Sequence, residues 1–176
     1  PADRIRHFSL MTGDYEQRFG GVGRLVGREG LERLSRAHVC VIGVGGVGSW
    51  SVEALVRSGV GRVTMIDRDD VCITNTNRQL PATAETVGKS KVAVLSRRMK
   101  EIHPFCGIHA VEEFFTESTA ERHLAERYDY VIDAVDRAAT KALIISRCVA
   151  ARIPVLTVGG AGGRRDATAV RCGDLS

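Results

Sequence analysis

Short runs of apolar, often β-branched residues alternate along the chain with longer segments whose apolar residues recur at three- and four-residue spacing. The short runs, which are typical of buried strands, are residues 38–42, 62–67, 107–111, 130–133 and 154–158. The segments with helical spacing are residues 29–37, 49–58, 90–102, 118–127 and 138–152. This alternation predicts an α/β fold with a doubly wound, mostly parallel, Rossmann-like sheet and helices on both faces.

Local signals support several of these elements. The run at residues 38–42 is apolar and β-branched, as in a strand covered on both faces. Ser118 and Glu121 have the spacing of a capping box, which predicts that a helix begins there. The polar, Asn-rich segment 68–86 predicts a long loop, and long loops inside compact domains are usually functional.

The pattern divides the chain into two parts. We expect residues 1–37 to form an Arg-rich basic arm followed by a short helix, and residues 38–176 to form the Rossmann-like core. We expect the core to continue beyond Ser176, because the chain stops soon after its last strand-like run.

Composition narrows the class of protein. Apolar residues make up 44% of the 176 and are spread throughout, which excludes a disordered or collagen-like chain. No apolar run approaches the ~20 residues of a membrane-spanning helix, and no apolar segment of a secretion signal follows the basic start. The 5 cysteines include no C-x-x-C pair, so we expect reduced thiols in a cytoplasmic protein. The net charge of +4 favours an anionic ligand without identifying it.

Glycine accounts for 19 of the residues and is clustered. One cluster, between the first predicted strand and its helix, contains Gly43, Gly45, Gly46 and Gly48. Such a loop lets the backbone turn sharply and approach phosphate oxygens, and the helix behind it presents free N–H groups. Asp67, at the end of the second strand, suits the hydroxyls of a ribose. These features fit NAD, FAD or ATP equally well.

Polar residues beyond the second strand distinguish between these nucleotides. The string 67–79 has Asn, Arg and Gln at close spacing, and the motifs 88–91 and 133–136 follow it. Together these motifs resemble the ubiquitin-activating-enzyme-like adenylyltransferases, the superfamily of ThiF, MoeB and HesA. The resemblance covers residues 18–174, and it implies that the chain binds ATP and Mg²⁺.

Elementary chemistry gives matching roles to four polar residues. A carboxylate that attacks the α-phosphate of ATP meets another anion, so the site needs positive charge and hydrogen-bond donors. Asn75, Arg78 and Lys91 would supply them, and Asp136, after the fourth strand, would hold Mg²⁺ on the polyphosphate. In the superfamily, residues at these positions have these catalytic roles. Taken singly, Arg78 and Lys91 could be solvated surface charges and Asp136 a helix N-cap.

Within the superfamily, residues 71–79 and the glycine-rich segments 17–21 and 157–163 are similar to a bacterial branch that modifies tRNA. This similarity implies that ATP adenylylates the threonyl carboxylate of threonylcarbamoyladenosine beside the anticodon. Loss of AMP then closes a ring, so the overall change is the loss of water. The similarity also implies a homodimer in which Arg18 or Arg24 enters the partner's site. A cysteine desulfurase and its sulfur acceptor are further implied partners.

Two other functions stay open. The first is activation of the C-terminal carboxylate of a small ubiquitin-like sulfur carrier. Many enzymes of that kind bind a structural zinc through two C-x-x-C pairs, which are absent from this sequence. The second is a non-enzymatic, regulatory NAD-binding domain.

Three smaller features each have two interpretations. Residues 159–163 could leave room for a nucleoside or form a tight turn. Arg164 and Arg165 could contact an RNA backbone or lie in a solvated turn. Cys72 could handle sulfur beside the site or be a small loop residue.

Overall fold

A computed structural model of the chain describes residues 2–160, 162–163 and 165–174, with side chains from residue 13 onward. A five-stranded sheet lies at the centre, and all of its strand pairs are parallel. The strands are β1 (His38–Ile42), β2 (Arg62–Ile66), β3 (Gly107–Val111), β4 (Tyr130–Asp133) and β5 (Val155–Thr157). Their order is β3-β2-β1-β4-β5, which is the doubly wound arrangement that the sequence predicts.

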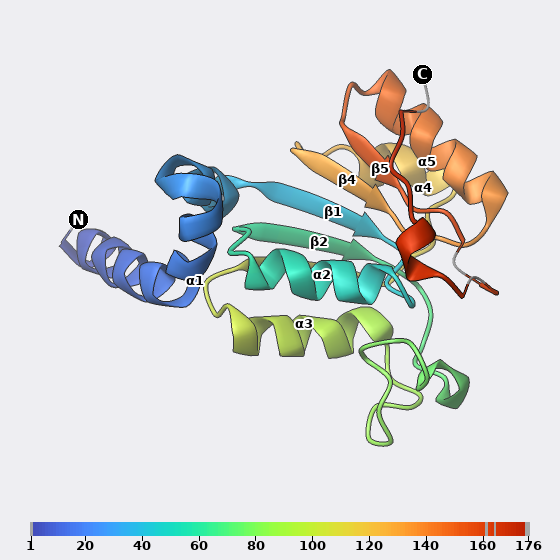
Figure 1. Cartoon of the computed structure of the whole chain (residues 1–176), viewed down its shortest axis with the longest axis horizontal. Helices are drawn as coiled ribbons and strands as arrows, with labels where there is room; N and C mark the ends of the chain where they lie inside the picture. The colour runs from blue at the N-terminus through green and yellow to red at the C-terminus, as the bar shows by residue number, and fades with distance from the viewer. Residues whose placement is uncertain (1, 161, 164, 175–176) are drawn as a thin grey trace.

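Helices cover both faces of this sheet (Figure 1). The α-helices are α1 (Ala2–Arg36), α2 (Gly48–Arg57), α3 (Lys91–Ile102), α4 (Glu117–His123) and α5 (Ala138–Ala150). Two short 3₁₀ helices are η1 (Ile73–Asn75) and η2 (Ala167–Ala169). Figure 1 shows α2 and α3 on one face and α4 and α5 on the other. Among the described residues, no helix has both the length and the apolar character that a bilayer crossing requires.

Strand β1 contributes to both apolar cores, because successive side chains of a strand point to opposite faces. Val39 and Val41 join the cluster formed with α2 and α3, whereas Cys40 and Ile42 join the cluster that includes Cys148 of α5. All residues of β1 are buried, which confirms the prediction of a strand covered on both faces. Parallel sheets need this double cover.

The two ends of the sheet are different places. We call the end where the strands begin the amino edge and the end where they finish the carboxyl edge. Helix α1 lies at the amino edge and is interrupted by Gly27, whose φ of 77° belongs to the left-handed region that glycine favours (Figure 1). There the ring of Phe19, 3% exposed, packs 4.7 Å from the ring of His103, and the Tyr15 hydroxyl donates to the carbonyl of Gly59.

The predicted start of the fourth helix is wrong. Thr116, not Ser118, is the N-cap of α4, because the N–H of Thr116 donates to the Thr119 hydroxyl in a capping box of its own. Other predicted elements are too long, beginning with this helix, which the sequence predicts through residue 127 and which ends at His123. Helix α5 ends at Ala150 and is followed by Arg152 at a φ of 55°, and β5 is shorter than the run 154–158 at both ends.

Candidate functional site

The glycine loop joins β1 to α2 at the carboxyl edge, beside the point where the strand order reverses. Gly43 has a φ of 83°, and a Cβ there would lie 3.1 Å from the backbone of Ala134. A Cβ on Gly48 would collide with the carbonyl oxygen of Gly43. The N–H groups of residues 45–47 donate no hydrogen bond to any described residue. The loop therefore offers free donors at a helix N-terminus, which is the chemistry of a phosphate site.

Asp67 lies beside this loop, where the sequence predicts an acid. Its Oδ2 accepts a hydrogen bond from the N–H of Val44 at 2.7 Å, and its Oδ1 accepts one from the N–H of Asp69 at 2.8 Å. The carboxylate thus connects the glycine loop to the segment after β2. Each oxygen keeps a further lone pair, so the predicted contact with a ribose stays a prediction.

Arg78 lies over the glycine loop. Its Cγ and Cδ would be 3.4 Å from a Cβ on Gly46, and its Nη1 donates to the carbonyl of Thr74 and to Asn77 Oδ1. The indole Nε1–H of Trp50, on α2, donates to the Arg78 carbonyl at 3.0 Å. The guanidinium is exposed, so it can reach a ligand above the loop.

The neighbours of Arg78 are buried polar residues. Asn75 is 8% exposed, and its Oδ1 accepts from the N–H of Cys72 at 3.0 Å, so this side chain also supports η1. Gln79 is 9% exposed, and its Oε1 has no hydrogen-bond partner among the described residues. Its Nε2 would lie 3.6 Å from a Cβ on Gly45. An unpaired buried amide oxygen costs about 1–3 kcal/mol, so an unpaired Gln79 beside the loop indicates a site for a ligand or water.

Lys91 contacts the segment after β2 through both its backbone and its side chain. The N–H of Lys91 donates to the carbonyl of Asp69, and its ammonium lies 2.8 Å from Asp69 Oδ2. Only 5% of Lys91 is exposed, whereas more than half of the Asp69 side chain is. The sequence did not identify Asp69 as a site residue, and spacing alone does not show which carboxylate a lysine will meet.

A buried ion pair lies at the end of β4. Asp133 is fully buried, and its Oδ2 accepts from Lys141 Nζ at 2.8 Å and from the Thr157 hydroxyl. Its Oδ1 accepts from the N–H of Val135 at 3.1 Å. Asp133 therefore fixes the start of the loop that carries Asp136. The sequence identified neither partner as a site residue, since Asp133 could simply end the strand and Lys141 lies a helix turn beyond the motif.

Asp136 itself is exposed, and none of the ion pairs between described residues includes it. It does not cap α5, because the N-cap is Arg137, so that alternative is wrong. No group of three or more His, Cys, Asp or Glu side chains in the described part of the chain could hold a metal ion. A single free carboxylate still fits Mg²⁺ bound to a polyphosphate, because Mg²⁺ takes its other ligands from phosphates and water.

The three smaller predicted features involve Cys72, the glycine-rich segment 159–163 and the pair Arg164 and Arg165. Cys72 is exposed, and the Thr74 hydroxyl, which donates to its Sγ, holds the pKa of the thiol below its usual value. Gly159, Gly160, Gly162 and Gly163 have open space where a side chain would project, and Gly163 has a φ of 75°, which favours a turn. Ala161 and Arg164 lie outside the described residues, while Arg165 is exposed.

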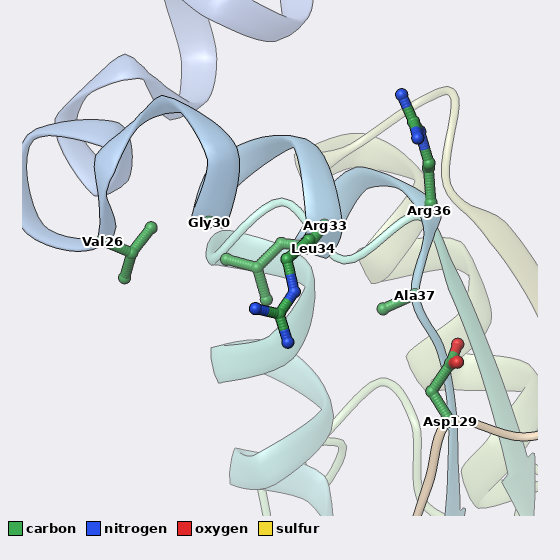
Figure 2. A pocket seen from close by; sticks show the side chains of 7 residues that line it. All are labelled: Val26, Gly30, Arg33, Leu34, Arg36, Ala37 and Asp129. Carbon is green, nitrogen blue, oxygen red and sulfur yellow. The ribbon is translucent and has the colours of Figure 1, made fainter.

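A separate hollow lies at the amino edge (Figure 2). Its lining comes from the second half of α1, the residue that joins α1 to β1 and the residue before β4: Val26, Gly30, Arg33, Leu34, Arg36, Ala37 and Asp129. None of the predicted site residues contributes to it. The hollow is therefore separate from the candidate site at the carboxyl edge.

Comparisons with known proteins agree with this geometry. The ThiF family model matches residues 21–173. The chain is 53% identical over 163 residues to the tRNA threonylcarbamoyladenosine dehydratase of Haemophilus influenzae, covering 93% of this chain and 62% of that protein. It is 46% identical over 167 residues to the Escherichia coli protein of the same name, covering 95% of this chain and 62% of the relative.

A solved structure is similar along most of the chain. The E. coli tRNA N6-threonylcarbamoyladenosine dehydratase in complex with ATP matches with a TM-score of 0.85 and 47% identity. The match covers 87% of this chain and 63% of that protein. The chain thus spans a little under two thirds of the length of these relatives.

Proposed function

The chain belongs to the ThiF family, and on this premise we propose that it is a cytoplasmic, ATP-dependent enzyme that dehydrates threonylcarbamoyladenosine in tRNA. The observation that carries the proposal is the assembly at the carboxyl edge. There the glycine loop, Arg78 and Asp67 are joined by direct contacts, in a chain 53% identical to a dehydratase of that name. Free backbone donors beside an exposed guanidinium suit a polyphosphate.

The proposed reaction has two steps. An oxygen of the threonyl carboxylate attacks the α-phosphorus of ATP, the bond to the β-phosphate oxygen breaks, and pyrophosphate leaves. The carbamoyl oxygen of the same side chain then attacks the carbonyl carbon of the acyl adenylate, a urea N–H gives up its proton, the ring closes and AMP leaves. The carboxylate oxygen leaves with AMP, so the nucleoside loses the elements of one water.

The chain's contribution is positioning and charge rather than a covalent bond. N–H groups of the glycine loop and the exposed guanidinium of Arg78 would hold the phosphates as the attacking anion approaches. Lys91 shares its charge with Asp69 at 2.8 Å, and a polyphosphate, which carries more charge, would compete for it. Asn75 would orient η1 and offer its amide to the same group.

Asp136 would hold Mg²⁺ on the polyphosphate, and the ion would neutralise charge on the leaving pyrophosphate. The support for this assignment is an exposed carboxylate free of ion pairs within the described residues, on a loop whose start contacts the glycine loop. Asp133, which pairs with Lys141, holds the start of that loop in place through its hydrogen bond from the N–H of Val135.

We propose a homodimer in which Arg24, rather than Arg18, enters the partner's site. Arg18 is bound within its own chain, to Asp14 at 2.7 Å and to the carbonyl of Ile102. Arg24 is exposed and forms no ion pair with a described residue. The tRNA-modifying branch also suggests a cysteine desulfurase and its sulfur acceptor as partners.

The test is mass spectrometry of nucleosides from tRNA that bears threonylcarbamoyladenosine, after incubation with the protein, ATP and Mg²⁺. The expected result is a nucleoside lighter by one water, with AMP and pyrophosphate formed in equal amounts. An Arg78→Ala variant serves as the control for a contaminating activity. ATP–pyrophosphate exchange that requires a Gly-Gly-terminated sulfur carrier and ignores tRNA would replace this proposal with the carrier-activating function. Binding of NAD without binding of ATP would overturn both.

A further inference from the structure

Trp50 presents an apolar ring to solvent at the rim of the candidate site. It is the only tryptophan in the sequence, lies in the first turn of α2 and is 54% exposed. Its Nε1–H donates to the Arg78 carbonyl at 3.0 Å, so the polar end of the indole is already satisfied. What faces solvent is therefore the apolar ring, which is costly to leave exposed and useful for binding.

The position of the ring connects it to the phosphate end of the site. Helix α2 begins at Gly48, the last glycine of the loop, and Ser49 hydrogen-bonds to Gly45. Arg78, the hydrogen-bond partner of Trp50, lies against Gly46. The ring, the guanidinium and the free N–H groups of the loop thus share one rim.

The chemistry of the proposed substrate indicates which group approaches this rim. Asp67 marks the ribose end of the proposed ATP, after β2, whereas Trp50 lies on the helix that faces the phosphates. The group that reaches the α-phosphate from outside is the threonyl carboxylate, and in this substrate the carboxylate is attached to an adenine. Bases of single-stranded RNA loops are bound by stacking on aromatic side chains.

We propose that the exposed ring of Trp50 is a stacking platform for a base of the substrate RNA. This inference rests on the proposed function and deepens it by naming where the nucleobase binds. The hydrogen bond to Arg78 holds the indole in one orientation before the RNA arrives, so little conformational entropy is lost when the base stacks.

The test measures binding of a dye-labelled anticodon stem-loop that bears threonylcarbamoyladenosine. Trp50→Leu removes the ring and is expected to weaken binding roughly 5- to 100-fold. Trp50→Phe keeps a ring but removes the N–H donor, and we expect its affinity to stay within about threefold of the parent. Tyr130→Leu, which removes an exposed aromatic ring at the amino edge, is the matched control and should leave RNA affinity unchanged.

Intrinsic fluorescence gives an independent readout, because Trp50 is the sole tryptophan. Quenching by the stem-loop without ATP would support the stacking platform. Equal losses in Trp50→Leu and Trp50→Phe would overturn it, since the N–H bond to Arg78 would then be the important part. Quenching by ATP alone would assign the ring to the ATP adenine, and a signal that follows protein concentration would assign it to a contact between copies.

The nucleoside assay separates this inference from the proposed function. If the parent protein dehydrates tRNA while Trp50→Leu binds the stem-loop normally, the stacking platform is wrong and the function holds. If the stem-loop quenches Trp50 but no water is lost from tRNA, RNA binding holds and the dehydration is wrong.

Discussion

The amino and carboxyl edges of the sheet differ in the side chains they present and in how far those side chains are buried. At the amino edge, aromatic and histidine rings pack together, with Phe19 and His103 each 3% exposed. At the carboxyl edge, Arg78 and Asp136 are exposed, and the loop donors at residues 45–47 bond to no described residue. The amino edge buries its side chains in packing contacts, whereas the carboxyl edge keeps charged groups and hydrogen-bond donors available for a ligand.

Stability and chemistry should therefore be separable between the two edges. Substitutions of side chains packed at the amino edge should change the free energy of unfolding and leave nucleotide affinity nearly unchanged. Substitutions of exposed charges at the carboxyl edge should change nucleotide binding or turnover and leave stability nearly unchanged. The Asp133–Lys141 pair is the exception, because it is buried and also supports the loop that carries Asp136. Substitutions can test each part of this comparison.

Lys141→Met should have the largest effect on stability. It leaves the fully buried carboxylate of Asp133 without its cation, which costs about 3–5 kcal/mol of unfolding free energy. Chemical denaturation measures the change. Lys89→Met, at an exposed lysine, is the matched control and should stay within about 0.5 kcal/mol. A change below about 1 kcal/mol in Lys141→Met would mean that water or another cation replaces the lysine.

Lys91→Met should reduce turnover about 10²- to 10³-fold while the protein stays folded. The freed partner, Asp69, is mostly exposed and can be solvated, so little stability is lost. Steady-state turnover with saturating ATP, beside a denaturation curve, measures both quantities. Turnover within about threefold of the parent would place Lys91 outside the reaction and leave it a structural partner of Asp69.

Phe19→Ala should cost about 3 kcal/mol of unfolding free energy, because it removes a buried ring from between α1 and the start of the sheet. We expect the dissociation constant of ATP, measured by calorimetry, to change less than about twofold. Leu25→Ala, at a side chain that is 86% exposed, is the control. A large loss of ATP affinity in Phe19→Ala would break the separation between the edges.

The pH dependence of stability should be the smallest effect. Burial, aided by nearby arginines, lowers the pKa values of His38 and His103 at the amino edge, so the folded chain resists protonating them. The unfolded chain takes up these protons below about pH 6.5, so stability is complete above that pH and falls as the pH is lowered. The loss is at most about 1.4 kcal/mol per pH unit for each histidine.

Denaturation of the parent and of His103→Phe between about pH 7 and 5 checks this expectation, and the variant should show the flatter profile. A steeper profile in the variant would mean that other groups dominate. Asp14, whose charge raises the pKa of His103, and Lys100, whose charge lowers it, also face that ring and are the first groups to test.

The elements of the sheet could be predicted because hydrophobic periodicity is local. Residues 38–42, 107–111 and 130–133 form strands with the predicted bounds. The start of α4 could not be predicted from the sequence, since Thr116 and Ser118 are both good N-cap residues. Only the folded backbone decides which N–H groups need a cap. The glycine loop was visible because both its turn and its close contacts demand glycine.

The sequence could not predict which charged side chains pair with one another in the site. The pairing of Lys91 with Asp69 depends on residues 69–71 lying beside 88–91, and the pairing of Asp133 with Lys141 depends on how α5 packs. Trp50 has an ordinary place in a helix pattern, and only its exposure distinguishes it. Identity of side chains predicts what chemistry is available, whereas charge pairing and exposure require the fold.

The hydrogen bonds of Asp67 have a consequence for kinetics. The carboxylate holds Val44 and Asp69 at once, and the Ser49 hydroxyl joins Gly45 to Leu80. These bonds are made within the chain itself, so the shape of the loop is set by the protein and does not depend on contacts with a nucleotide. Association should then follow a single diffusive phase, without the slower rearrangement that accompanies loop closure.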